Sequence, residues 1–310
     1  MPTLGIALVL MLTTSCATTE DVQETAGINR TLTPSASRSP VTSTSAPPVR
    51  SATPFPSITA TPSDTPACSQ MQGFIEEGSY RSPVLRAEVP YRVYLPACYG
   101  ITTERHYTLY LLHGFPFDET HWEELGIAEF ADDEIASGRW PAFIIIMPLQ
   151  PDPLFLNTDG GPNSYEVEMV EGLIPAIDQR YRTDPRPAAR AVAGISRGGV
   201  WALEISFRHP ELFDTVAALS PALHVNFARP AYDPFILATK DQPLPANIFL
   251  SAGDAEPGFR HATEEFSAVL AVHGVRHEFI IGQGGHDALG WVSVLGDMLD
   301  YLLLAWSERS

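Results

Sequence analysis

Residues 191–201 of this chain read Ala-Val-Ala-Gly-Ile-Ser-Arg-Gly-Gly-Val-Trp. They combine a short apolar run, a Gly-x-Ser-x-Gly motif centred on Ser196 and a following stretch compatible with a helix. This order is typical of a tight turn that joins a buried strand to a helix and exposes the serine hydroxyl. Gly194 and Gly198 suit such a turn because they lack side chains that would clash in it. The stretch therefore predicts a strand, a sharp turn at Ser196 and a helix that begins near Arg197.

A serine in this position has the surroundings that an attacking hydroxyl requires. The first turn of a helix carries free N–H groups and the positive end of the helix dipole, and both can stabilise a developing oxyanion. The serine also needs a base within hydrogen-bond reach and a carboxylate that orients the base. Ser196 therefore indicates a serine hydrolase or acyltransferase, whereas a solvated serine in a glycine-rich turn is the alternative interpretation.

Strand-like and helix-like patterns alternate along the rest of the chain. This alternation predicts an α/β fold with a mostly parallel central sheet and helices on both of its faces. Residues 222–245 fit neither pattern and are candidates for a small cap over the site. The predicted strands are 73–85, 86–95, 107–112, 142–147, 189–195, 215–219, 247–251 and 277–281. The predicted helices are 119–137, 164–181 with a kink at Pro175, 263–273 and 288–306.

The order of the other two groups along the chain selects candidates for base and acid. In folds of this type the acid and then the histidine follow the serine, and both lie beyond the carboxyl ends of strands. His286 follows the last predicted strand in a glycine-rich loop, so it is the predicted base. The acid should follow the strand at 247–251, where both Asp254 and Glu256 are available and spacing does not choose between them.

Two backbone N–H groups are expected to bind the oxyanion. One belongs to Arg197, and the other belongs to Phe115 in the loop after the strand at 107–112. His113 begins this loop and can also simply pack there. Trp122 is a candidate wall of the acyl-binding site, and filling the core is its alternative role.

The first 66 residues are expected to lie outside the folded domain. Residues 1–16 contain a short apolar run and end in Thr-Thr-Ser-Cys, which resembles a bacterial lipobox with Cys16 as the lipidated residue. Plain secretion and an uncleaved anchor are the alternatives. Residues 17–66 are rich in Ser, Thr and Pro, which predicts a disordered linker. The catalytic domain would then span residues 67–310 and be held at the bacterial cell surface, or be secreted.

Cysteine usage and charge restrict the partners further. If Cys16 carries lipid, Cys68 and Cys98 remain and can pair in an oxidising compartment, with two free thiols as the alternative. The formal net charge is −18, with 37 acidic against 19 basic residues. This balance argues against binding to nucleic acid or to anionic lipid, so the lipid anchor is the one membrane attachment we expect. The spacing of Cys and His predicts no metal site, we expect no cofactor, and the oligomeric state stays open.

Several segments between residues 72 and 306 together resemble the Putative esterase family of α/β-hydrolases. This family includes feruloyl esterases, S-formylglutathione hydrolases, enterochelin esterases and mycolyltransferases. The segments are Tyr-Arg-Val-Tyr-Leu-Pro at 91–96, Leu-Leu-His-Gly at 111–114, Leu-Ile-Pro-Ala-Ile-Asp at 173–178, Gly-Ile-Ser-Arg-Gly-Gly at 194–199, Arg-His-Pro-Glu-Leu-Phe at 208–213 and Gly-Gly-His-Asp at 284–287.

The resemblance implies an α/β-hydrolase fold and a serine esterase that acts through an acyl-enzyme. It places the acid three residues after a glycine that ends a strand, which favours Glu256 over Asp254. Family members often carry Met after the serine, whereas this chain has Arg197, which can engage a carboxylate-bearing substrate or pair with a local acid. The implied substrates are small-molecule or polysaccharide-linked extracellular esters, either feruloylated or acetylated polysaccharide or a siderophore lactone. An acyltransferase and a non-catalytic surface binding protein are the alternatives.

Overall fold

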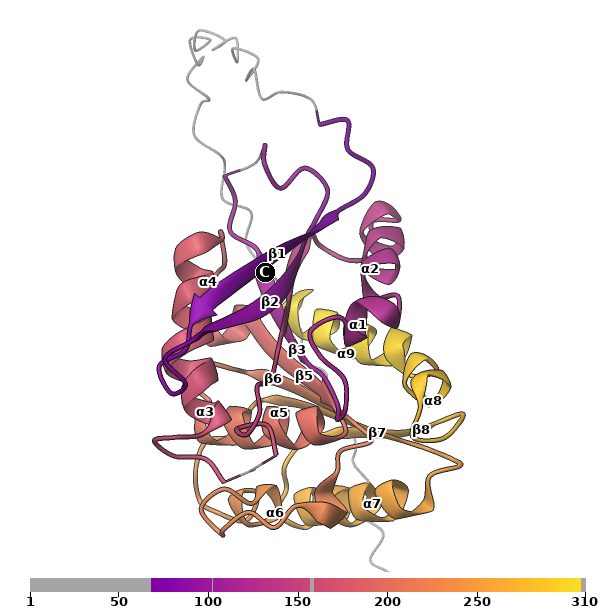
Figure 1. Cartoon of the computed structure of the whole chain (residues 1–310). Coiled ribbons are helices and arrows are strands. Elements are labelled where there is room, and N and C mark those ends of the chain that lie inside the picture. Colours follow the sequence, from indigo (N-terminus) through magenta and orange to yellow (C-terminus); the bar gives the residue numbers. More distant parts are fainter. Residues whose placement is uncertain (1–67, 102, 157–158, 308–310) are drawn as a thin grey trace, which may run out of the picture. The chain divides into compact units, whose positions relative to one another are not determined.

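The structure is a computed structural model, and it describes residues 68–101, 103–156 and 159–307 (Figure 1). The predicted signal segment 1–16, the lipidation at Cys16 and the linker 17–66 lie outside the described residues.

The centre of the domain is an eight-stranded sheet with the order β1-β2-β4-β3-β5-β6-β7-β8. The two strands at one edge, β1 and β2, are antiparallel to each other, and β2 is antiparallel to β4. All pairings from β4 to β8 are parallel, as the alternating pattern predicts. The strands are β1 (Phe74–Arg81), β2 (Glu88–Leu95), β3 (Tyr107–Leu112), β4 (Phe143–Pro148), β5 (Arg190–Ile195), β6 (Thr215–Leu219), β7 (Asn247–Gly253) and β8 (Glu278–Gly282).

Helices cover both faces of this sheet, and each face has its own apolar core (Figure 1). One core contains buried side chains from α4, α5 and α7, and the other contains side chains from α2 and α9. Successive residues of β5 alternate between the two cores, with Val192 in the first and Ala193 in the second. The helices are α1 (His121–Glu124), α2 (Ile127–Ala136), α3 (Tyr165–Val167), η1 (Glu168–Leu173), α4 (Ile174–Arg180), η2 (Pro187–Ala189), α5 (Arg197–Arg208), η3 (Leu223–Val225), α6 (Pro234–Leu237), α7 (Pro257–Val272), α8 (Ala288–Val292) and α9 (Leu295–Ser307).

Three predicted helices are interrupted. The helix predicted at 119–137 divides at Gly126, whose φ of 82° lies in the left-handed region that ends a helix. Within 164–181 the segment η1 is a π-helix that leads into α4, where Pro175 has no N–H to donate. The helix predicted at 288–306 consists of α8 and α9, which pack apolar side chains such as Trp291 into the core. By length and composition alone this last segment is apolar enough to cross a membrane.

The structure contains the predicted disulfide between Cys68 and Cys98, whose Cα atoms lie 5.7 Å apart. It joins the segment before β1 to the loop after β2.

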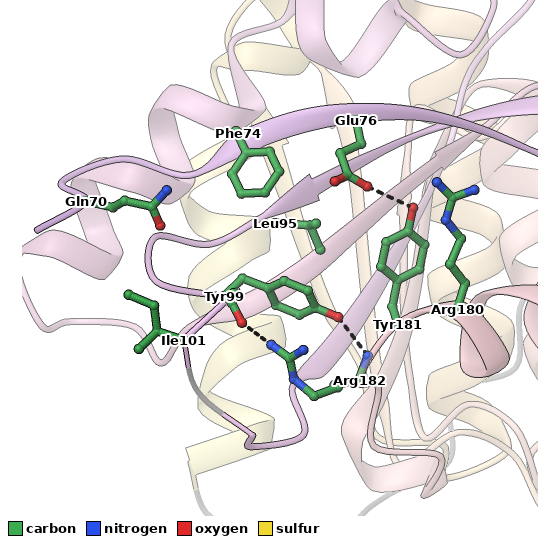
Figure 2. Close-up of a pocket in the computed structure, with 10 residues that line it drawn as sticks. Gln70, Phe74, Glu76, Leu95, Tyr99, Ile101, Arg180, Tyr181 and Arg182 are labelled. Atoms are coloured by element: carbon green, nitrogen blue, oxygen red, sulfur yellow. Dashed lines mark hydrogen bonds between the residues drawn. The ribbon is translucent and has the colours of Figure 1, made fainter. Parts of the chain in front are cut away.

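A cavity of about 730 Å³ lies near this disulfide (Figure 2). Its wall includes Leu95, at the end of β2, and Arg182, whose guanidinium lies 3.9 Å from the centre of the Tyr99 ring. Because β2 runs antiparallel to β4, this cavity lies at the amino ends of the parallel strands. The predicted site residues follow the carboxyl ends of those strands, so the cavity is separate from them.

Candidate active site

The turn at Ser196 has the strained geometry that the motif predicts. Ser196 follows β5 directly and has a φ of 55°, which is uncommon for a residue with a side chain. Its backbone N–H donates to the carbonyl oxygen of Leu219 at 2.9 Å. A Cβ atom at Gly194 would overlap the backbone of Gly198, so the close approach of strand and helix requires glycine. The turn places the Ser196 side chain at the carboxyl edge of the sheet.

The structure brings Ser196, His286 and Glu256 into one hydrogen-bonded line. His286 Nε2 lies 2.9 Å from the Oγ atom of Ser196, and His286 Nδ1 lies 2.7 Å from Oε2 of Glu256. In this arrangement Nδ1 donates to the carboxylate, which leaves Nε2 free to accept the proton of the serine hydroxyl. The three residues follow β5, β8 and β7, so their meeting is a consequence of the parallel sheet.

Neighbouring groups hold the Glu256 carboxylate in place. Its side chain is only 3% exposed, and its Oε1 atom accepts the Gly253 N–H at 2.5 Å and the hydroxyl of Ser220. Hydrogen bonds to a carboxylate stabilise its charged form in a buried position. Asp254 is exposed instead, and its Oδ1 accepts the N–H of Gly284 at 2.9 Å. The structure therefore joins Glu256 to His286, while Asp254 supports the loop that carries His286.

Two aromatic rings fix the imidazole of His286. The ring of Phe259 stacks on it with centroids 3.6 Å apart, and the ring of Trp291 meets it edge-on at 5.3 Å. These two side chains and Ser220 escape prediction from the sequence. They come from three separate segments, and no motif joins them to the histidine.

The loop after β3 lies against Ser196 from the other side. A Cβ atom at Gly114 would lie 3.3 Å from Cβ of Ser196. The carbonyl oxygen of Gly114 accepts the N–H of Phe117 at 2.9 Å and lies 3.0 Å from His113 Nδ1. Because the Gly114 carbonyl and the Phe115 N–H share one planar peptide, fixing the carbonyl also fixes the direction of that N–H.

His113 acts here as a neutral positioning group. Its Nε2 accepts the backbone N–H of Gln150 at 2.9 Å, so its Nδ1 carries the proton and donates to Gly114. Burial lowers the pKa of His113 to about 4, which keeps the ring uncharged near neutral pH. The sequence offers His113 as a packing residue, and the structure adds its hydrogen bonds to the loop.

The two remaining predicted residues differ in their surroundings. Trp122 lies on α1 and is only 1% exposed within the core beside α2 and α9, which favours the packing interpretation over a substrate wall. Arg197 is the first residue of α5, as predicted. Its backbone N–H therefore belongs to the free N–H groups of the first helical turn.

Comparison with known proteins assigns the family. Residues 82–302 match the profile of the family described as Putative esterase. The chain belongs to this family. A solved structure of a ferulic acid esterase has a TM-score of 0.68 and 24% sequence identity, covering 76% of this chain and 99% of that one. This likeness shows that the fold is that of the α/β-hydrolases, as predicted.

Two curated relatives share more of the sequence. A protein named endo-1,4-beta-xylanase/feruloyl esterase, from Xylanibacter ruminicola, is 31% identical over 68% of this chain and 28% of its own length. The ferri-bacillibactin esterase BesA of Bacillus subtilis is 32% identical over 45% of this chain and 51% of its own length. The chain thus spans about half or less of the length of these relatives.

Proposed function

We propose that this protein is a serine carboxylic-ester hydrolase that works through an acyl-enzyme at Ser196. The observation that carries the proposal is the line of hydrogen bonds from Ser196 through His286 to the buried Glu256. Membership of an esterase family supports the same reaction class.

The reaction would proceed in two steps. The Oγ atom of Ser196 attacks the ester carbonyl carbon while His286 Nε2 takes the hydroxyl proton, and the carbonyl π electrons move onto oxygen. The backbone N–H groups of Phe115 and Arg197 stabilise this oxyanion. The bond to the alcohol then breaks and His286 returns the proton to the leaving oxygen. A water molecule, deprotonated by His286, hydrolyses the acyl-enzyme in the same manner, and Glu256 stays ionised throughout.

The relatives suggest the substrates, and the disulfide suggests the compartment. One carries feruloyl esterase in its name and the other is a ferri-bacillibactin esterase, which favours feruloyl-polysaccharide or siderophore esters as substrates here. The disulfide between Cys68 and Cys98 favours an oxidising compartment. We infer that the enzyme acts outside the cytoplasm, with a lipid at Cys16 and residues 17–66 linking the domain to the membrane.

Hydrolysis of 4-nitrophenyl acetate and butyrate by the full chain tests the reaction class. The wild-type protein should hydrolyse both esters, and Ser196→Ala should lower kcat/KM by about 10⁴-fold or more. A folded wild-type protein that hydrolyses neither ester would contradict the proposal and favour a binding protein. Unchanged hydrolysis in Ser196→Ala would show that another group carries the reaction.

A further inference from the structure

The guanidinium of Arg197 lies half-buried beside the nucleophile without a carboxylate partner among the described residues. Its Nη1 donates to the carbonyl oxygen of Leu156 at 3.3 Å. The chain carries 37 acidic residues, and other half-buried or buried arginines such as Arg92 and Arg190 pair with one. The sequence leaves open whether Arg197 pairs with a local acid, and the described residues contain no such pair. A cation that is partly removed from water and lacks an anion can bind one from a ligand.

The side chain of Arg197 extends toward the loop after β3, which carries the proposed oxyanion donor Phe115. Leu156 follows Phe155, whose ring stacks on that of Phe115 with centroids 6.1 Å apart. These residues belong to the loops after β3 and β4, on one side of β5, whereas His286 and Glu256 come from loops on the other side. Arg197 therefore lies on the side of Ser196 away from the catalytic base, where an ester substrate can reach it.

Large apolar side chains are exposed on the same two loops. Phe115 is 59% exposed, Leu156 is 50% exposed and Phe117 is 39% exposed. Exposed apolar groups that gather at the carboxyl edge of a parallel sheet favour contact with the apolar body of a ligand. The two loops thus carry exposed apolar side chains at the edge of the sheet where Arg197 lies, and Leu156 is both exposed and in contact with Arg197.

We propose that Arg197 is an anion-binding group of the substrate site, and that the site favours, beyond the esters that the relatives suggest, esters whose apolar body ends in a carboxylate. This inference rests on the proposed serine-esterase function. The planar guanidinium can bind a carboxylate through two parallel hydrogen bonds, and partial burial strengthens that contact. The exposed rings of the two loops would hold the apolar part of the ester.

A matched pair of esters tests this role. Mono(4-nitrophenyl) adipate carries a carboxylate at the end of its acyl chain, and 4-nitrophenyl hexanoate is its neutral counterpart. The measured quantity is the ratio of kcat/KM for the anionic ester to that for the neutral ester. Arg197→Met, which removes the charge and keeps an unbranched side chain, should lower this ratio by about tenfold to a hundredfold, mainly through KM. Arg197→Lys should retain part of the ratio, and in the wild type the ratio should fall as salt rises.

A second arginine supplies the control. Arg180→Met changes the net charge by the same amount, but Arg180 is exposed at the end of α4, beside the cavity at the opposite edge of the sheet. It should leave the ratio unchanged. Equal ratios in the wild type and Arg197→Met, with the neutral ester still hydrolysed, would overturn the role of Arg197 alone. A wild-type protein that cleaves neither ester would overturn the proposed esterase function and this inference with it.

Discussion

Two glutamate–histidine pairs in this domain have nearly the same local geometry and different surroundings. Oε2 of Glu256 lies 2.7 Å from Nδ1 of His286, and Oε1 of Glu166 lies 2.7 Å from Nε2 of His209. Both carboxylates are buried, with side-chain exposures of 3% and 5%, and both imidazoles are about one-quarter exposed. The separation between carboxylate and imidazole therefore does not distinguish the proposed catalytic pair from the structural one.

The difference lies at the second nitrogen of each ring. His286 presents Nε2 to the hydroxyl of Ser196, whereas His209 presents Nδ1 to a second carboxylate, Glu211, at 3.0 Å. The carboxylates of Glu166 and Glu211 accept hydrogen bonds from the ring of His209, and this raises the pKa of His209. Both ring nitrogens of His209 face carboxylate oxygens, so neither is placed to take a proton from a hydroxyl, while His286 keeps an acceptor for the serine.

The largest expected effect is a loss of kcat/KM that distinguishes His286 from His209. His286→Gln should lower kcat/KM for 4-nitrophenyl butyrate by about 10⁴-fold or more, because the serine loses its proton acceptor. His209→Gln should leave kcat/KM nearly unchanged and lower the stability of the fold instead. Parallel steady-state kinetics on the two variants would check this, and a similar loss of activity in both would remove the distinction.

The next effect concerns the two candidate acids near His286. Glu256→Gln should lower kcat by about 10³- to 10⁴-fold, because an amide can neither fix the tautomer of His286 nor stabilise its cation. Asp254→Asn should have a far smaller effect, since Asp254 accepts only from the backbone N–H of Gly284 in the supporting loop. The reverse order of the two losses would identify Asp254 as the acid.

A smaller effect is expected for the stability contributed by the structural pair. Burial alone would raise the pKa of Glu166, but hydrogen bonds from His209 and Arg208 lower it to about 2. A depressed carboxyl pKa stabilises the fold above the unfolded value near 4.5, and this contribution is lost as the pH falls toward 2. Glu166→Gln should therefore cost about 3 kcal/mol at pH 7 in urea unfolding, because it breaks a buried ion pair. Equal stability of the variant and the wild type would show that the pair contributes nothing.

The last predicted effect, about 1 kcal/mol for each pH unit, has the opposite sign and concerns the neighbouring Glu204. This side chain is fully buried on α5, and burial followed by the charge of Glu166 raises its pKa to about 10. Between the unfolded value and 10 the folded state keeps a proton that the unfolded state releases, so stability falls as pH rises. Between pH 5 and pH 8, the wild type should lose about 1 kcal/mol more per pH unit than Glu204→Gln. Parallel pH dependence in urea unfolding would contradict the assigned protonation of Glu204.

The sequence predicts those parts of the site that are local. The turn at Ser196 and the loop at His286 both combine glycines with an adjacent strand, so their positions follow from short motifs. Glu256 and Asp254 are two residues apart, and the choice between them depends on how the chain turns after Gly253. Asp254 is exposed to solvent, whereas Glu256 is buried directly before α7. The spacing of the two residues along the chain does not predict this difference.

The fold, like the site, has parts that local sequence patterns predict and parts that they do not. The alternation of strands and helices predicts the parallel sheet, because each strand is a short apolar run with clear boundaries. The interruption at Gly126 depends on a single residue within an otherwise helical pattern, and there the sequence predicts one helix instead of two. Phe259 and Trp291 meet His286 only through tertiary packing, which local patterns do not contain.

The most direct test of the central claim is to label the protein with a fluorophosphonate and map the modified peptide by mass spectrometry. We expect a single adduct on Ser196 that is absent in Ser196→Ala, forms much more slowly in His286→Gln and forms at the wild-type rate in His209→Gln. An adduct on another residue, or labelling that persists in Ser196→Ala, would contradict the assignment of Ser196 as the nucleophile.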